Sequence, residues 1–572
     1  MKEKKLVCSL ISFFMIFSLA LPLLSSVVEA SPVTEIRDWH ELHAIRDNLG
    51  GHYLLMNDLE ATTAGYQELA SPTANQSKGW EPIGIYERGG SFDPFVGIFD
   101  GQGYEIKDLF IDRPDEDGMG LFRALVVEGE GGVIQNVGVV NARVTGYMNV
   151  GGLLGFNAGN VSSSYCTGNV TGNWSVGGLV GLNTGNVSDS YSSASVTGGW
   201  FAGGWFAGGL VGCNMEGTVS NSYSSGNVTG GTLVGGLVGY NEKGIVSNSY
   251  SDAVVTSEQG VGGLVGGNDG GMVRNSYSSG SVTGDEYIGG LVGYNWNWDA
   301  VVGSCYSSGS VTGDSRVGGL VGGNDYYATV VTSYASGSVT GNGSVGGLVG
   351  YNRGTVSNCH SSGGVAGNSP VGGLVGNNTD TVSNSFWDTE TSGMLVSDGG
   401  VGKITIEMMD IATFTDTRTQ GLEDPWDITA VAHGETNDAY AWNIVDGESY
   451  PFLTGKRPSE YDLTISSTAG GNITAPGEGL YTYHAGSVVD LVGEPEEGYR
   501  FVNWSGDVDT IADVNAAATN ITMQGNYTIM ANFERPVNNA LIGGVVAAVV
   551  VAGSVALFML RRRRRVAETK GL

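Results

Sequence analysis

One string of glycine and apolar residues recurs nine times in the middle of the chain. The string is GGLVGxN or a close variant, and its copies start 26 to 31 residues apart. Each copy continues as a segment of the type VxNSYSSGxVTG. Short β-branched and aromatic runs between Gly, Asn and Ser are typical of strands and turns, and the unit shows no helical period. Each unit therefore predicts one coil of three short strands. The copies begin at Gly151, Gly177, Gly208, Gly235, Gly262, Gly289, Gly318, Gly346 and Gly372.

Alignment of the nine units gives three columns of like residues. The first column is leucine, from Leu153 to Leu374. The second is aromatic, from Tyr165 to Phe386, and includes one histidine, His360. The third column is asparagine in all nine units. Its members are Asn157, Asn183, Asn214, Asn241, Asn268, Asn295, Asn324, Asn352 and Asn378.

Coils of this kind predict an all-β fold, a parallel β-helix. Parallel strands stacked about 4.8 Å apart place like residues above like. We expect the leucines and the tyrosines to form interior stacks, with His360 packed among them, and the asparagine amides to form a hydrogen-bonded ladder. The preference of parallel crossovers for one hand favours a right-handed solenoid.

The units resemble the GLUG motif of bacterial and archaeal surface proteins, and the resemblance covers residues 132–387. Upstream, within 31–131, the strings GWEPIG and GIFDGQGYEIKDLFI resemble the coils that lead into such repeats. Some immunoglobulin-A-cleaving metallopeptidases carry similar repeats before a catalytic part. That part is not recognisable here, because a zinc peptidase of that type needs HExxH and the nearest string, His40 to His43, has the wrong spacing.

Segments on both sides of the repeat are expected to cover its open ends. Trp39, Leu42, Ile45 and Leu49 recur at helical spacing after Asp38, which predicts a short N-terminal capping helix. Residues 388–455 resemble the closing segment of GLUG arrays. The resemblance rests on the string FWDTETSG, which spans residues 386–393, and on YPFL at residues 450–453. Capping is needed because an open solenoid end exposes strand edges and apolar core.

A separate small β domain is expected at residues 461–534, where alternating strands replace the repeat. The segment resembles the divergent internalin-type B-repeat found beside bacterial surface anchors. The resemblance rests on Gly498 and on four aromatic residues expected in its core, and its position suggests a stalk. The aromatic residues are Tyr499, Phe501, Trp504 and Phe533.

The two ends of the sequence predict a single-pass cell-membrane protein. Residues 1–30 have the lysines, apolar run and small-residue end of a cleaved signal peptide. Residues 540–560 carry no charge and would be roughly 31 Å long as a helix, enough for one transmembrane span. Residues 561–572 begin with five arginines, which hold that side in the cytoplasm and leave the bulk of the chain extracellular.

Composition narrows the classes of function. A net charge of −31 argues against a nucleic-acid partner, because phosphates would be repelled. The 95 glycines show no three-residue period, which excludes collagen. Outside the signal segment, the four cysteines form no CxxC pair and are not spaced as a disulfide framework. Cys305 and Cys359 share a column two coils apart and are expected to stay free thiols.

The repeat offers little catalytic chemistry. Hydrolases and lyases with this fold need carboxylates or basic groups gathered on adjacent coils, whereas outward positions here are mainly Ser, Asn and Gly. We therefore expect no enzyme activity and no catalytic, cofactor or resident metal site. The acidic string from Asp112 to Gly118 permits a Ca²⁺ hypothesis, but it fails the EF-hand template and a solvated loop is the favoured interpretation.

One pair of turns departs from the repeat and predicts a ligand site. After the ladder asparagine most units have a small or polar turn, whereas two successive units carry aromatic residues there. Aromatic faces edged by polar groups suit sugar rings, although the same side chains could instead fold over the corner and cover the core. The candidate residues are Trp296, Trp298, Asp299, Tyr326 and Tyr327.

Three classes of function follow from these features. The first is a membrane-anchored adhesin or extracellular binding scaffold whose partner is a glycan or another cell surface. The second is a passive structural component of the envelope. The third, least favoured, is a β-helix enzyme that processes polysaccharides.

Overall fold

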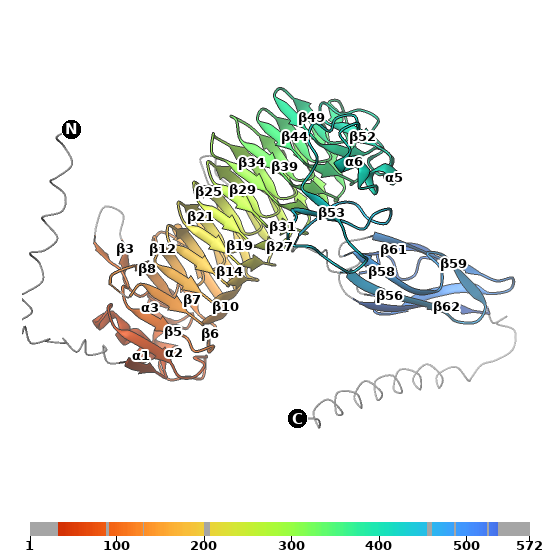
Figure 1. The fold of residues 1–572 in the computed structure, drawn as a ribbon. Coiled ribbons are helices and arrows are strands. Elements are labelled where there is room, and N and C mark those ends of the chain that lie inside the picture. Colours follow the sequence, from red (N-terminus) through yellow and green to blue (C-terminus); the bar gives the residue numbers. More distant parts are fainter. Residues whose placement is uncertain are drawn as a thin grey trace, which may run out of the picture. The chain divides into compact units, whose positions relative to one another are not determined.

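The computed structural model describes residues 33–86, 91–129, 131–199, 206–454, 460–484, 488–508, 510–522 and 526–535. The predicted signal peptide at 1–30, the predicted transmembrane helix at 540–560 and the basic tail at 561–572 lie outside these residues. Within the described ranges, no helix combines the length and the apolar character needed to cross a membrane. The chain divides into two compact units, and most of the first is a stack of parallel coils (Figure 1).

The coils form a parallel β-solenoid, as the repeat predicts. One face of the solenoid is a sheet of thirteen parallel strands, here called sheet A. Its strands are β1 (Val33–Ile36), β2 (His52–Leu55), β5 (Ile98–Asp100), β9 (Val133–Gln135), β13 (Asn160–Ser162), β17 (Asn186–Ser188), β22 (Thr218–Ser220), β26 (Ile245–Ser247), β30 (Met272–Arg274), β35 (Val301–Gly303), β40 (Thr329–Val331), β45 (Thr355–Ser357) and β50 (Thr381–Ser383).

A second face, sheet C, has ten parallel strands and precedes sheet A in each coil. Its strands are β8 (Phe122–Val126), β12 (Leu154–Ala158), β16 (Val180–Asn183), β21 (Val211–Met215), β25 (Val238–Glu242), β29 (Val265–Asp269), β34 (Val292–Trp296), β39 (Val321–Asn324), β44 (Val349–Asn352) and β49 (Val375–Asn378). Short strands on the third side, such as β31 (Tyr277–Ser278), β32 (Val282–Thr283) and β33 (Glu286–Gly289), complete each coil as sheet B. The right-handed sense of the coils stays a prediction.

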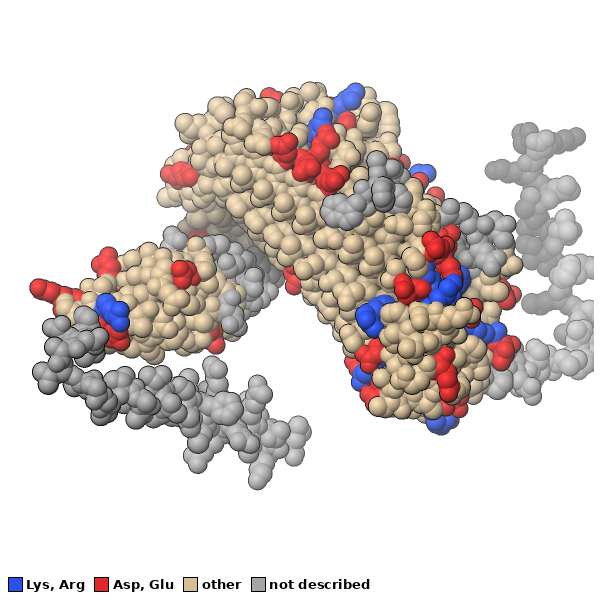
Figure 2. Space-filling model, turned by 180° about the vertical axis from the view of Figure 1, so that it is seen from behind, with Lys and Arg blue, Asp and Glu red and all other residues tan. Residues whose placement is uncertain are grey.

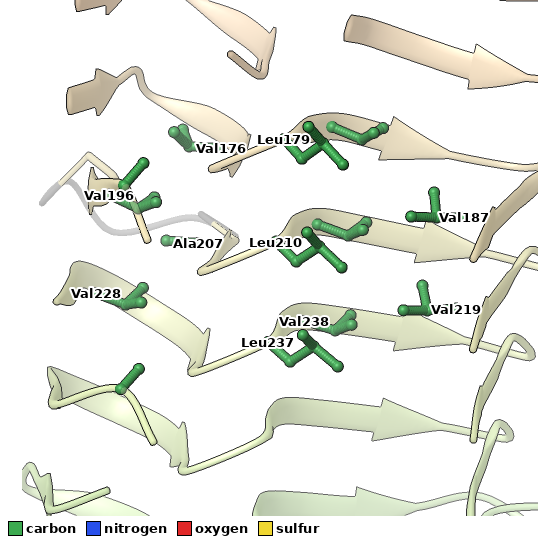
Figure 3. Packing of buried hydrophobic residues seen from close by; sticks show 14 of the residues in the cluster. Val176, Leu179, Val187, Val196, Ala207, Leu210, Val219, Val228, Leu237 and Val238 are labelled. Carbon is green, nitrogen blue, oxygen red and sulfur yellow. The ribbon is translucent and has the colours of Figure 1, made fainter. Parts of the chain in front are cut away.

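The interior is a stack of aliphatic residues, one level for each coil. Leu179, Leu210 and Leu237 lie one above another in Figure 3, and all three are fully buried. Valines from the three sheets surround them. Burial of this kind is the main stabilising contribution, roughly 25 cal/mol for each Å² of apolar surface removed from water. The predicted leucine stack is therefore confirmed.

The predicted asparagine ladder is also confirmed. The side-chain amide of each asparagine donates to the amide oxygen of the asparagine in the next coil, from Asn157 to Asn378, at 2.7–2.8 Å. The glycine that follows in most coils leaves room for this ladder. A Cβ built on Gly244 would lie 2.2 Å from the amide nitrogen of Asn214, so a side chain cannot be placed there without movement.

The tyrosine column forms a stack, but on the outside of the solenoid and not in its interior. Successive rings from Tyr165 to His360 lie 4.7–5.0 Å apart, and the first five tyrosines are only half-buried. The residues on either side of each tyrosine, which are mostly serine, are buried instead, and the serine hydroxyls find hydrogen-bond partners there. Ser222, for example, donates to the carbonyl of Ser220 at 2.7 Å. The interior position predicted for the tyrosines is therefore wrong. Tyr306, Tyr334 and His360 belong to the same outer column and are buried where Tyr450 and Pro451 lie against His360.

Aromatic and helical segments cover the two ends of the first unit. At the N-terminal end, α1 (Trp39–His43) and a 3₁₀ turn (Ala44–Asp47) bury Trp39, Leu42 and Ile45, and Asp38 caps the helix by accepting from the Glu41 amide at 2.9 Å. At the other end, Phe414 and Trp426 pack against Phe386, and the Nε2 atom of His360 lies 2.9 Å from the carbonyl oxygen of Pro451.

The remaining described helices are short and lie outside the coils' strands. They are α2 (Tyr66–Leu69), α3 (Ala74–Ser77), α4 (Thr389–Ser392), α5 (Thr405–Met408) and α6 (Ala412–Thr415).

The second unit contains a small β domain with two sheets. One sheet has the order β58 (Gly479–His484), β56 (Glu460–Ser467), β62 (Tyr527–Glu534) and β60 (Arg500–Gly506), and the other has β57 (Gly471–Ala475), β59 (Val488–Pro495) and β61 (Ala518–Thr522). Trp504 and Phe533 are buried between them, and Tyr499 and Phe501 pack against this core, as predicted.

Candidate functional site

The candidate site lies at the corner between sheets C and A in two successive coils. Strand β34 is followed by a turn that carries Trp298 and Asp299, and β39 by a turn that carries Tyr326 and Tyr327. Both turns are longer than those of the neighbouring coils. Ala300 and Ala328 occupy the position where Gly271 and Gly354 stand in adjacent coils.

The two turns are in contact through their aromatic rings, as their place in the repeat predicts. The ring centroids of Trp298 and Tyr327 are 4.3 Å apart, with planes inclined by 35°. Trp298 is 74% exposed and Tyr327 is 57% exposed. These rings therefore do not cover the core, and the alternative interpretation of the turns does not apply to them. We refer to Trp298, Asp299, Tyr326 and Tyr327 as the corner cluster.

Tyr326 and Tyr327 both have left-handed backbone conformations, with φ of 51° and 69°. Such conformations are uncommon for residues other than glycine and are costly for bulky side chains, about 1–3 kcal/mol each. Most other coils place glycine or a polar residue at this corner, for example Gly270 or Lys243. The two tyrosines thus adopt strained backbone conformations at a corner where other coils have residues without an aromatic ring.

A network of polar contacts fixes the corner cluster on the solenoid. The carboxylate of Asp325 is nearly buried and accepts from the Tyr326 amide at 2.8 Å and from the Tyr294 hydroxyl at 3.0 Å. The guanidinium of Arg353 lies 3.8 Å from Asp325 and 5.2 Å from the ring centroid of Tyr326. Asp299 is exposed at the rim. The cluster therefore combines exposed aromatic surface with adjacent hydrogen-bonding groups.

Trp296 does not lie on the corner with the other candidates. It is half-buried on the outer face of sheet C, where its ring stacks with Tyr294 at 4.5 Å and with Tyr240 at 6.0 Å. Of the predicted ridge of two tryptophans and two tyrosines, the structure thus shows the contact between Trp298 and Tyr327 and places Trp296 elsewhere. The reason is that the neighbouring coil has Gly267, which leaves space for the indole.

Tyrosines 240, 294 and 351 were not among the predicted site residues, although the sequence carried a signal for them. They occupy the variable position of the GGLVGxN string, where Gly267 and Gly323 alternate with them. Burial raises the pKa of Tyr240 and Tyr294, and the hydrogen bonds to Asp269 and Asp325 add to the effect. Both phenols therefore stay protonated and act as donors.

Metal binding finds little support in the side chains that the structure describes. Among them, no three of His, Cys, Asp and Glu come together as a ligand set. In the acidic string that suggested Ca²⁺, the Glu116 carboxylate is taken up by Lys78, Arg113 and Arg123 at 3.0–3.3 Å. The Glu116 carboxylate is therefore engaged by positive side chains.

Two curated relatives match parts of the chain. "Halomucin" from Haloquadratum walsbyi is 38% identical over 133 residues, which is 22% of this chain and 1% of halomucin. A "Putative Gly-rich membrane protein" from Evansella cellulosilytica is 32% identical over 106 residues, which is 18% of this chain and 10% of that protein. The matches therefore span only a small part of each relative.

Among solved structures, a Bacteroides ovatus protein described as "a putative immunoglobulin A1 protease" matches with a TM-score of 0.33 and 21% identity. The match covers 44% of this chain and 76% of the other. Family models agree with both resemblances of the sequence. The GLUG motif is matched at residues 172–197, 203–229, 230–256, 257–283, 284–312 and 313–340. This chain thus carries six matched GLUG motifs, followed by a divergent InlB B-repeat domain at residues 461–536.

Proposed function

We propose that the protein is a non-enzymatic, surface-displayed binding scaffold and that the corner cluster binds an extracellular glycan. The observation that carries this proposal is the exposed contact between Trp298 and Tyr327. Contiguous exposed aromatic groups with polar neighbours are typical of interaction sites, and amphipathic rings provide apolar contact together with hydrogen bonding. The backbone cost at Tyr326 and Tyr327 further supports a role other than folding.

The surface location is part of the proposal. We propose that residues 1–30 are cleaved, that residues 540–560 anchor the chain and that residues 561–572 face the cytoplasm. The names of two relatives, halomucin and a Gly-rich membrane protein, support a location at the cell surface or membrane. The solenoid and the B-repeat domain would then be displayed outside the cell.

A glycan array tests the binding function. The full chain is applied to an array of extracellular polysaccharides and oligosaccharides, beside a variant with Trp298→Ala and Tyr327→Asn. We expect saturable binding by the wild type and a loss of at least about tenfold in the variant, which corresponds to about 1.4 kcal/mol. Asparagine tolerates the left-handed conformation at position 327, so the variant keeps the turn.

A matched control uses an exposed tyrosine from the first coils. Tyr104→Ala removes an aromatic ring of similar kind away from the corner and should bind as the wild type does. The thermal midpoint of Tyr104→Ala should agree closely with that of the wild type, since exposed substitutions usually change stability by about 0.5 kcal/mol or less, and the corner variant should be no less stable. Binding that survives in the corner variant would refute the site, an array without any ligand would favour a passive envelope component, and release of sugar products would indicate an enzyme.

A further inference from the structure

The outer face of sheet C carries aromatic residues in every second coil. The strand register places Tyr240, Gly267, Tyr294, Gly323 and Tyr351 in one column. Adjacent strands lie about 4.8 Å apart, so successive tyrosines of the column are separated by about 10 Å. Each glycine leaves an open space between two tyrosine rings.

Side chains from other positions fill both spaces: Leu233 and Trp296 lie against Gly267, and Tyr287 lies against Gly323. A Cβ built on Gly267 would lie 2.9 Å from Cη2 of Trp296, and one built on Gly323 would lie 2.6 Å from Cδ1 of Tyr287. Tyr287 in turn packs against Tyr294, with ring centroids 4.4 Å apart. The two glycines therefore join separate tyrosines into a continuous row of rings.

An arginine extends the row to the next tyrosine. The guanidinium carbon of Arg316 lies 4.5 Å from the ring centroid of Tyr287 and 5.6 Å from that of Tyr351. Arg316 also forms an ion pair with Glu286. The resulting surface, here called the aromatic strip, runs over four coil steps, or about 19 Å, along the solenoid axis. Its members are Tyr240, Trp296, Tyr294, Tyr287, Arg316 and Tyr351.

The solenoid itself does not require these large side chains. All six are partly exposed, so none of them is core. Tyr287 and Arg316 adopt left-handed conformations, with φ of 58° and 56°, at a position that Ser175, Leu233 and Ser344 occupy in other coils. Because two other coils carry only a serine at this strained position, the coil does not need side chains as large as Tyr287 and Arg316 there, which indicates a use outside packing.

The strip continues into the corner cluster. Asp325 joins them, because it accepts a hydrogen bond from the Tyr294 hydroxyl in the strip and one from the backbone amide of Tyr326 in the cluster. Tyr240 similarly donates to Asp269 at 2.7 Å. The carboxylates of Asp269 and Asp325 thus lie beside the rings as hydrogen-bond acceptors.

Charge restricts the kind of polymer that fits this surface. Two positive groups beside the rings form ion pairs, Arg316 with Glu286 and Arg353 with Asp325. The whole chain carries a net charge of −31. On the face that Figure 2 shows, the coils expose mostly uncharged surface, with acidic and basic atoms gathered in a few groups. An anionic polymer would be repelled, whereas a neutral one would not.

We propose that the aromatic strip and the corner cluster together bind an extended, neutral polysaccharide that runs along the solenoid axis. This inference rests on the proposed glycan-binding function of the corner and adds the length and charge class of the ligand. A row of rings about 19 Å long provides repeated contacts to a repeating polymer, so affinity should rise with chain length until the row is filled.

The experiment measures binding of the full chain to neutral glucan, xylan, mannan and galactan, each as disaccharide, longer oligosaccharide and polymer. Polygalacturonate and heparin serve as anionic counterparts. The strip variant combines Tyr240→Leu with Tyr351→Asn, because Leu182 and Asn377 already occupy this column. The control, Tyr223→Leu, removes a half-buried tyrosine from the tyrosine column, which belongs to sheet B and not to the aromatic strip.

We expect the wild type and the control to bind at least one neutral polymer about tenfold or more tightly than its disaccharide. In the strip variant the affinity for the polymer should fall toward that for the disaccharide. Neutral binding with no length dependence, or binding that the strip variant leaves intact, would overturn the strip while the corner function stands. Preference for an anionic polymer would overturn the charge argument, and binding to no glycan on the panel or the array would refute both proposals. Circular dichroism and thermal unfolding of each variant establish that it is folded.

Discussion

The side-chain amide of Asn241 donates a hydrogen bond to Oδ1 of Asn268 across a distance of 2.7 Å, and Asn268 donates to Asn295 at 2.8 Å. All three side chains are fully buried. Every amide in this part of the ladder therefore depends on both neighbours for hydrogen bonds that water cannot replace.

Asn268→Ala should lower the free energy of unfolding by about 2–4 kcal/mol, because Asn241 loses its acceptor and the Asn295 oxygen loses its donor. Urea unfolding measures the loss. The control is Asn378→Ala at the half-buried end of the ladder, where the ladder bond from Asn352 and two local bonds with the Asp380 backbone are removed but water can reach the site. We expect a loss of about 1 kcal/mol there. Equal losses in the two variants would show that the ladder is not cooperative with the fold.

The cysteines should behave as inert, unlinked thiols. Cys305 and Cys359 occupy the inward serine column with Ser333 between them, since the Cys305 amide donates to Ser333 Oγ at 3.1 Å. Two coil steps are about 10 Å, beyond the roughly 7 Å limit between Cα atoms of a disulfide. Burial also raises the pKa of Cys166, Cys213 and Cys359 to about 12.

A thiol reagent at pH 8 should label none of these four cysteines in the folded protein and all of them after denaturation. Mass spectrometry of the unreduced chain shows whether any two of these cysteines are joined by a disulfide. A Cys305–Cys359 disulfide would contradict the placement of one repeat in each coil.

The inside of the solenoid could be predicted where one residue type repeats without exception. Leucine and asparagine do so in all nine units, and their columns lie inside. The side of the tyrosine column could not be predicted from residue type, because tyrosine is ordinarily more buried than serine. Here the serines are satisfied in the interior by backbone carbonyls, as Ser222 shows, so the tyrosines take the outer side.

The corner contact between Trp298 and Tyr327 followed from their place in successive repeats. The aromatic strip did not, because its continuity depends on side chains that cross from one coil to another. Trp296 turns back over Gly267, one coil before its own. A column of alternating Tyr and Gly was visible in the sequence, but which ring fills each space is decided by side-chain packing.

His360 should make the stability of the C-terminal coils depend on pH. Burial lowers its pKa to about 4, although the contact with the Pro451 carbonyl opposes the shift. His360 therefore becomes protonated near pH 6.5 in the unfolded chain but only near pH 4 in the folded chain. Stability is complete above pH 6.5 and falls as the pH drops toward 4, by up to about 3 kcal/mol.

Thermal midpoints measured from pH 7.5 to 4.5 test this dependence. His360→Phe keeps a ring in the stack and removes the titrating group, so its midpoint should change less over this interval than that of the wild type. Identical pH profiles for the two proteins would show that other groups control acid stability.

We expect one substitution in the corner cluster, at Tyr327, to weaken glycan binding and to raise the stability of the protein. Tyr327 has φ of 69°, which glycine adopts without the cost that a side chain incurs, and its ring is mostly exposed. Tyr327→Gly should therefore relieve backbone strain while it removes little buried surface. We expect a free energy of unfolding higher by about 1 kcal/mol, less whatever the more flexible unfolded chain takes back.

The same variant should lose glycan binding, because Trp298 no longer has an aromatic partner. The comparison is Gly270→Tyr, which introduces the strained residue at a corner in an earlier coil, where φ is 59°. That change should destabilise the protein by a similar amount and leave the corner cluster intact. Urea unfolding and the glycan array, applied to both variants, give the two readouts. If Tyr327→Gly were less stable than the wild type, the ring of Tyr327 would have to contribute more to the fold than its exposure indicates, and the argument that the corner exists for binding would lose its support.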